Sequence, residues 1–425
     1  MSLGVFLILF TFLIVFNMPL SVAMILSTLA YIFSNGMDLS FIAMRMYTSL
    51  ANFILLAIPF FLLTSEVMTR AGLSKRLFRF AQSLVGFVPG GLGHVNILNS
   101  VIFSGMSGSA VADAGGIGRL SYEAMADQGY GKEFSMSVTA ASAVIGPIIP
   151  PSLPMVVYAM VANESIGRLF FGGIGPGLIL AFTLMVYVFV VSKRRDYPVN
   201  ESFNLRQIIR DFGKAFLPLL TPIILLGGIY FGVVTITEAA VLAVLYAVVL
   251  GSAVYRSLTL RDFYESLCNV VTICGPILLL IVGATLFGFV LTIENVSVIV
   301  SELITALSDN PYIVLLLINI IFLVLGTMSD PLVNIMLFAP LFIPLVRIVG
   351  ISTVHFGVVV VLNSMIGLIT PPVGALLVTV SGFGKVRFAK LLKEIWPLIL
   401  VELFVLIIIT LFPWTVLAIP NMLFG

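Results

Sequence analysis

Charged side chains are scarce in this sequence. Only 9% of its 425 residues are Asp, Glu, Lys or Arg, and 60% are hydrophobic, against about 25% and 45–50% in an ordinary soluble domain. A soluble fold could not bury that much apolar surface. The net charge of +2 is small and scattered, and no basic stripe is interleaved with aromatic residues. The sequence therefore argues against a nucleic-acid-binding protein.

Several catalytic signatures are also missing. The sequence has no H-E-x-x-H motif, no nucleotide-binding glycine fingerprint and no Walker A motif, so we expect neither an enzyme nor direct use of ATP. Cys268 and Cys274 have no histidine close in sequence, and they are expected to be packing residues rather than metal ligands. No polar or low-complexity linker divides the chain, which favours one membrane domain.

Long apolar runs predict an all-α polytopic membrane protein. The first run, residues 3–33, lacks the basic start and cleavage site of a signal peptide. It exceeds one span of about 20 residues, and Asn17-Met18-Pro19 divides it into two short helices. With these two, we expect ten crossings. The others lie at residues 50–69, 133–162, 170–192, 214–233, 237–256, 273–293, 354–382 and 396–418.

Two further apolar segments, residues 94–126 and 312–345, are interrupted midway by small or polar residues. We expect them to be re-entrant hairpins, each entering and leaving the membrane on one side. Basic residues should gather at cytoplasmic span ends, and the crossing count places four basic clusters on one face and the acidic segment 294–309 on the other. Both termini are then outside. The clusters are Arg70, Lys75, Arg76 and Arg79; Lys193, Arg194 and Arg195; Arg256 and Arg261; and Lys385, Arg387, Lys390 and Lys393.

The two halves of the chain repeat each other. VIGPIIPPS at 144–152 aligns with MIGLITPPV at 365–373, an offset of 221 residues, and FSGMSGSAVAD at 103–113 aligns with VLGTMSDPLVN at 324–334 at the same offset. Five crossings per half is an odd number, so the second copy is expected to be inverted, as in many secondary transporters. We predict a first repeat at residues 1–192 and a second repeat at 214–425, joined by a cytoplasmic connector at 193–213. The scaffold helices are expected in residues 1–69 of the first repeat and 214–293 of the second.

Each half carries a Pro-Pro pair that breaks a helix. Pro150 and Pro151 lack N–H donors and release carbonyl groups that a continuous helix would bond, and Thr370-Pro371-Pro372 repeats this. Such backbone is tolerated at membrane depth only where protein buries it or where it lines a wet cavity. Carbonyl groups suit Na⁺, and helix N-termini suit a carboxylate.

The hairpin tips supply the facing groups. Ser107, Gly108 and Ser109 form the first tip, and the second, which includes Thr327 and Ser329, carries the full charge of Asp330. We predict one Na⁺ at each tip with its facing break. The alternative is that small residues merely allow close helix packing. A carboxylate at this depth costs at least about 2.5 kcal/mol unless compensated, which a bound cation would do; Asp330 could also cap the outgoing helix.

A substrate anion is expected between the tips. Ser107 and Gly108 would contact it, and Asp113, Asn334 and Asn363 could line the same cavity. For the last three, hydrogen bonding between helices is the competing interpretation.

Taken together, the motifs resemble the large membrane subunit of the tripartite ATP-independent periplasmic (TRAP) transporters, the DctM-like family, over essentially the whole chain. The stretches that carry the resemblance are IPFFLLTSEVMTRAGLSKRL (58–77), FSGMSGSAVADAGGIG (103–118), VIGPIIPPS (144–152), GTMSDP (326–331) and ITPPVG (369–374). It implies Na⁺-coupled import of an organic acid across a bacterial inner membrane, with an elevator-type transport domain. In such a membrane the termini, which the crossing count places outside, are periplasmic. Carried over by position, the sodium sites are Ser107 and Ser109 with Gly146 and Pro150, and Gly326, Thr327 and Asp330 with Thr370 and Pro371.

The same resemblance implies two protein partners, a small four-helix membrane subunit and a periplasmic substrate-binding protein. Because the chain starts directly at Met1 and the first span, we expect the small subunit to be a separate polypeptide. Sialic acid, other sugar acids and C4-dicarboxylates all remain open as substrates. The alternatives are a stand-alone sodium-coupled dicarboxylate or anion symporter without a binding protein, an uncoupled channel and, less readily, a membrane enzyme.

Overall fold

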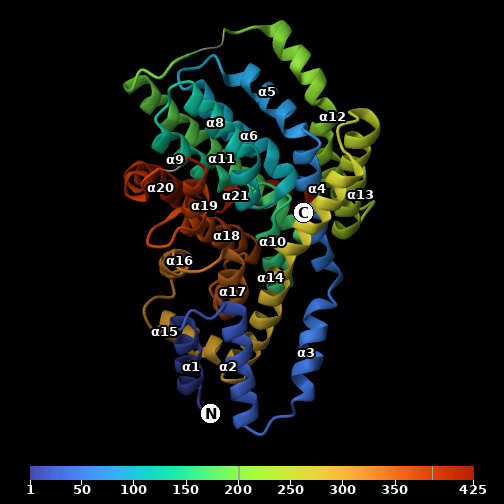
Figure 1. Ribbon diagram of the computed structural model, residues 1–425. Helices are drawn as coiled ribbons and strands as arrows, with labels where there is room; N and C mark the ends of the chain where they lie inside the picture. The colour runs from blue at the N-terminus through green and yellow to red at the C-terminus, as the bar shows by residue number, and fades with distance from the viewer. Residues whose placement is uncertain (200–201, 385) are drawn as a thin grey trace.

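The computed structural model describes residues 1–199, 202–384 and 386–425, and within these ranges the protein consists of helices and connecting loops without strands (Figure 1). Lys385, one of the predicted basic residues, lies outside the described part. The first half contains α1 (Leu3–Val15), α2 (Leu20–Ser34), α3 (Ser40–Leu50), η1 (Phe53–Leu56), α4 (Ala57–Arg70), α5 (Leu73–Val85), α6 (Gly91–Ser107), α7 (Ala110–Asp113), η2 (Ala114–Gly118), α8 (Arg119–Asp127), α9 (Lys132–Ala143), α10 (Leu153–Ala162) and α11 (Ile166–Arg194).

The second half contains α12 (Leu205–Tyr230), α13 (Ile236–Val249), η3 (Leu250–Val254), α14 (Leu260–Ile293), α15 (Val296–Thr305), α16 (Pro311–Gly326), α17 (Pro331–Ile348), α18 (Thr353–Ile369), α19 (Ala375–Gly384), α20 (Phe388–Leu411) and α21 (Trp414–Phe424).

Seven helices in the described ranges are long and apolar enough to cross a membrane. Six of them coincide with predicted crossings, and the seventh is α17, the outgoing arm of the second predicted hairpin. The first apolar run is two short helices, as predicted, because α1 ends before Asn17 and α2 begins after Pro19. The predicted crossings at 133–162 and 354–382 each consist of two shorter helices on either side of a Pro-Pro pair, α9 with α10 and α18 with α19. The count of ten crossings stays a prediction.

The predicted connector, residues 193–213, includes the end of one helix and the start of the next. Helix α11 continues through Arg194, and α12 begins at Leu205, where the Asn204 side chain accepts a hydrogen bond from the Gln207 amide at 3.2 Å. Charged residues at these helix ends interrupt the apolar pattern without ending the helix. The sequence prediction also contained no helix at α3, α5, α15 or α21, which are short or amphipathic.

The 221-residue offset extends to the helix boundaries. Shifted back by 221, α17 falls on residues 110–127, the range covered by α7, η2 and α8. In the same way α18 and α20 fall on 132–148 and 167–190, over α9 and α11, and α14 falls on 39–72, over α3 and α4. The bonds Pro150-Pro151 and Pro371-Pro372 are both cis. The relative orientation of the halves in a membrane stays a prediction.

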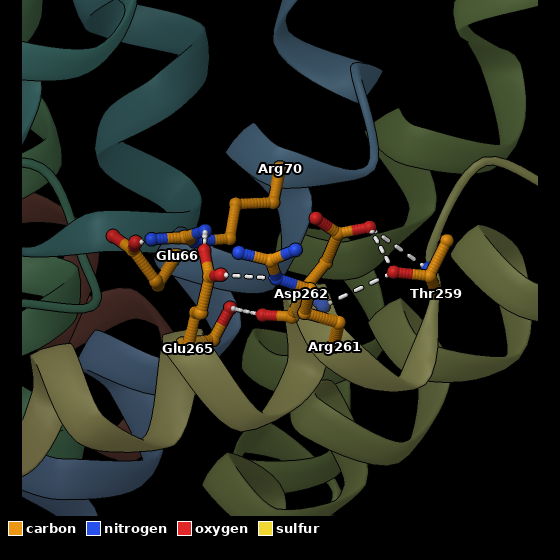
Figure 2. Close-up of polar contacts among 7 residues, drawn as sticks. Glu66, Arg70, Thr259, Arg261, Asp262 and Glu265 are labelled. Atoms are coloured by element: carbon orange, nitrogen blue, oxygen red, sulfur yellow. Dashed lines mark hydrogen bonds and ion pairs between the residues drawn. The ribbon is translucent and has the colours of Figure 1, made fainter.

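Helices α2, α3 and α4 each pack against α14, and α4 also packs against α13, whereas the hairpin helices α6 and α8 pack with α9, and α16 and α17 pack with α18. The two sets are in contact, because α17 packs against α14 and α6 packs against α4. Figure 1 shows α1, α2 and α3 at one end of the molecule and α5 and α8 at the opposite end. Arg70 of α4 forms an ion pair with Glu66 of the same helix at 2.9 Å and with Glu265 of α14 at 2.7 Å, and so links the two helices (Figure 2).

Candidate functional site

The first hairpin tip lies directly against the first helix break. The Leu153 amide, at the start of α10, donates to the Gly108 carbonyl at 3.3 Å. Gly108 has φ +60, and a Cβ atom there would lie 2.4 Å from the Pro151 carbonyl oxygen. No other residue fits this position without moving the break. Tip and break therefore form one unit, as the sequence predicted by placing them opposite each other.

Side chains at both ends of this unit cap the helices that it interrupts. The Ser109 hydroxyl accepts from the Ala112 amide at 3.4 Å at the start of α7, and the Ser152 hydroxyl accepts from the Met155 amide at 3.2 Å at the start of α10. These contacts satisfy helix N-terminal donors that would otherwise be orphaned. A Cβ atom on Gly146 would lie 3.6 Å from the Ser109 carbonyl oxygen, so these two predicted sodium ligands are neighbours.

Ser107 differs from Ser109. Its side chain is fully buried, and its hydroxyl has no hydrogen-bond partner among the described residues. Buried hydroxyl groups are nearly always bonded. An unpartnered oxygen beside the close approach of Gly108 and Pro151 fits a ligand for a small cation.

The second tip is built around Asp330, which caps α17 by accepting from the Leu332 amide at 2.8 Å. Beside it, the Thr327 hydroxyl donates to the Val324 carbonyl at 2.8 Å, and Ser329 lies 2.5 Å from the Asn334 side-chain oxygen. Of these groups, only Asp330 brings a full charge. Its side chain is exposed at the surface of a cavity rather than buried in packing.

The end of α16 lies close to α18. A Cβ atom on Gly326 would lie 3.2 Å from the Gly367 Cα atom, so the second tip begins where these helices cross. The second break follows one turn later, where the Thr370 hydroxyl donates to the Ile366 carbonyl at 2.7 Å. Tip and break are again neighbours in the fold.

One cavity of about 220 Å³ joins the two tips. Gly108 and Ser109 border it from the first half, and Asp330 borders it from the second. Its remaining lining is mostly apolar and includes Leu62 of α4 and Ile273 and Ile277 of α14. The cavity therefore lies between the hairpins and the α4 and α14 helices, with a few polar groups from both tips.

Of the five predicted substrate-binding residues, only Gly108 borders this cavity, and the other four, Ser107, Asp113, Asn334 and Asn363, do not. Asp113 is fully buried, and neither carboxylate oxygen has a hydrogen-bond partner in the described ranges. The Asn363 amide donates to the Asn319 side-chain oxygen at 2.8 Å and carbonyl at 2.9 Å, and so joins α18 to α16. Asn334 lies against Ser329. The contact of Asn363 is that of the helix-bonding alternative, whereas the contact of Asn334 lies within the second tip.

Sequence reasoning missed Glu402. It lies within the 24-residue α20, its side chain is fully buried, and both carboxylate oxygens lack a partner among the described residues. Helix α20 packs against α9, α11 and α18. A single carboxylate in the middle of an apolar helix is itself a functional signal, and it could have been read from the sequence.

The chain matches the family model of the "Tripartite ATP-independent periplasmic transporter, DctM component" over residues 6–415. It is 43% identical over 410 residues to the sialic acid TRAP transporter large permease protein SiaM of Vibrio cholerae, covering 96% of each chain. It is 35% identical to the C4-dicarboxylate TRAP transporter large permease protein DctM of Pseudomonas aeruginosa, covering 90% of each.

Among solved structures, the YdaH transporter of Alcanivorax borkumensis is similar in fold. The TM-score is 0.62 at 13% sequence identity, with 91% of this chain and 88% of that chain covered. The family match spans nearly the whole chain, and the motifs that carried the resemblance lie within it. The protein belongs to the DctM family, the large permease component of tripartite ATP-independent periplasmic transporters.

Proposed function

We propose that this permease imports an organic acid by coupling its movement to Na⁺, with the substrate bound in the cavity between the two hairpin tips. The observation that carries the proposal is that cavity itself, which is bordered by Ser109 from one half and by Asp330 from the other. A site made by both halves of a repeat, at interrupted helices, is the usual location of substrate and coupling ions in secondary transporters.

The residues present fit a sodium ion at each tip. At the first, the unpartnered Ser107 hydroxyl and the backbone around Gly146 and Pro150 offer oxygen atoms. At the second, Asp330 offers a carboxylate and Thr327 a hydroxyl group, and Thr370 and Pro371 follow Gly367, which lies against Gly326. Oxygen ligands of this kind suit a hard cation. The bound ions would supply positive charge beside the cavity and so favour an anionic substrate.

Movement between the two faces is proposed to follow an elevator mechanism. Helices α2, α3 and α4 each pack on α14, while the hairpin helices α6 and α8 pack with α9, and α16 and α17 pack with α18. In this proposal the hairpin helices move as a unit with α9 and α18, sliding across the contacts of α17 with α14 and of α6 with α4, and they carry both tips and the substrate. Leu62, Ile273 and Ile277 present a mostly apolar wall that such a unit could pass.

The substrate and partners follow from the relatives. Their names specify sialic acid in one protein and C4-dicarboxylates in another, so we propose an organic anion without choosing between them. The transporter would work with a small four-helix membrane subunit and a periplasmic binding protein, in a bacterial inner membrane with both termini periplasmic. The alternative, a stand-alone symporter with no binding protein, remains the second candidate.

Transport measurements on reconstituted protein distinguish the tripartite transporter from the stand-alone symporter. Proteoliposomes that contain this chain with candidate small subunit and binding protein should accumulate radiolabelled sialic acid or succinate only when a Na⁺ gradient and the binding protein are both present. Uptake by this chain alone would favour the stand-alone symporter. Equal uptake with Na⁺ replaced by K⁺ would contradict sodium coupling.

A further inference from the structure

A second cavity, of about 210 Å³, lies between α5 and α8 and shares no lining residue with the cavity at the tips. Lys75, Phe78, Arg79 and Gln82 line it from α5, and Leu120 lines it from α8. In Figure 1 these two helices lie at the end of the molecule opposite α1, α2 and α3.

The sequence of α5 explains why these side chains meet. Lys75, Arg79 and Gln82 are spaced at i, i+4 and i+7, so they share one helix face. Leu73, Leu77 and Ala81, on the other face, are fully buried, and α5 packs there against α6 and α12. A short amphipathic helix with a basic face and a buried apolar face is typical of a segment lying at a membrane surface.

The basic groups in this cavity are available for a ligand. Lys75 and Arg79 are exposed, and neither forms an ion pair with any residue in the described ranges. The neighbouring cations are engaged elsewhere, because Arg76 lies over the Tyr255 ring at 4.0 Å and Arg119 pairs with Glu123 at 2.9 Å.

The apolar residues in the lining limit the class of ligand that this cavity can bind. Phe78 and Leu120 stand in the same cavity as the two cations, so its occupant needs negative charge and hydrocarbon together. A free phosphate ion offers only the charge. Anionic phospholipids offer both, and basic pockets between helices on the cytoplasmic side are recognised sites for their headgroups.

The second half has no counterpart. At the 221-residue offset, Lys75, Arg79 and Gln82 correspond to Val296, Val300 and Leu303 of α15, which are uncharged. The feature therefore belongs to one end of the molecule only. That end is the one predicted to face the cytoplasm, where the membrane surface carries anionic lipid.

We propose that the cavity between α5 and α8 binds one anionic phospholipid. Lys75 and Arg79 contact the headgroup charge, and Phe78 and Leu120 contact the glycerol and the first methylene groups of the acyl chains. The site lies between α5 and the outgoing arm of the first hairpin, so the lipid would contact both.

Native mass spectrometry of the full chain in mild detergent, titrated with phosphatidylglycerol or phosphatidylcholine, tests the proposal. We expect phosphatidylglycerol to bind at least about tenfold more tightly. K75Q/R79Q should weaken phosphatidylglycerol binding on the order of 30-fold, given the usual contribution of each basic residue near an anionic membrane surface. K390Q/K393Q, which removes two exposed cations from α20, should change it little.

Two further variants distinguish lipid binding inside the cavity from lipid attraction by surface charge alone. L120W fills the cavity and keeps both cations, so it should abolish selective binding, whereas K75R/R79K should retain it. If K75Q/R79Q does not fold, as judged by gel filtration and thermal unfolding, L120W decides the question. Equal affinity for the two lipids, unchanged binding in L120W, or full competition by glycerol phosphate at the lipid's own concentration would overturn the proposal.

Discussion

Gly326 and Gly367 touch backbone to backbone where α16 crosses α18. A Cβ atom on Gly367 would lie 2.5 Å from the Gly326 carbonyl carbon, which is closer than two such atoms can approach. The contact holds the second tip against the helix that leads into the second break.

The first prediction follows from that contact. Gly367→Ala should force the helices apart and lower the free energy of unfolding by about 1–3 kcal/mol, the usual effect of overpacking. The measurement is the thermal unfolding midpoint in detergent. Gly382→Ala in α19 is the matched control, because no atom lies within 4 Å of its added Cβ. A Gly367→Ala variant as stable as the control would show that the helices separate freely.

The second prediction concerns the carboxylate of Asp330. Asn is as good a helix cap as Asp, so Asp330→Asn should keep α17 capped and folded while it removes the charge beside the cavity. Sodium-driven uptake should then fall by at least about tenfold, since each 1.4 kcal/mol of lost cation binding is a factor of ten. Asp309→Asn, an exposed carboxylate outside the cavity lining, is the control. Undiminished uptake by Asp330→Asn would remove this carboxylate from the mechanism.

The predicted orientation is tested by cysteine labelling in intact cells. A single cysteine at Asp309 should react with a membrane-impermeant maleimide added outside, because the acidic segment is predicted to face the periplasm. A cysteine at Lys193 should react only after the membrane is opened. The opposite pattern would reverse the orientation of both hairpins. Both parent side chains are exposed, so burial does not confuse the comparison.

Glu402 gives a prediction that separates stability from transport. A buried carboxylate without a partner is unfavourable, so Glu402→Gln, which keeps the shape and removes the charge, should leave the unfolding midpoint unchanged or raise it. If the carboxylate serves transport, the uptake rate should fall in the same variant. A lower midpoint with normal uptake would instead assign Glu402 a purely structural role.

The features that were predicted well are those in which one residue changes the backbone directly. Pro19, Pro150 and Pro371 each remove a donor, and a helix ends near each of them. The first tip lies against its break, where the Leu153 amide bonds the Gly108 carbonyl, and the start of the second tip lies against the helix that leads into the second break, where Gly326 meets Gly367. Helix α5 was missed, since Lys75, Arg76 and Arg79 break its apolar run while its buried face is only a few residues wide.

The parts of the site that were not predicted come from the packing of distant segments. Leu62 and Ile273 border the tip cavity, yet apolar side chains in an apolar helix carry no sequence signal. Similarly, the bond between Asn363 and Asn319 depends on how α16 crosses α18. Such contacts follow from tertiary structure, and spacing along the chain does not encode them.

The two breaks are alike in sequence but differ in burial. Residues 150–153 are buried throughout, whereas Pro372 is exposed and Val373 is 49% exposed. The segment after the second Pro-Pro pair is therefore uncovered in this chain, and the segment after the first is enclosed by it. In deuterated solvent, the amide of Val373 should exchange its hydrogen far sooner than the amide of Leu153, which bonds the Gly108 carbonyl, so the two matching segments would exchange at separate rates.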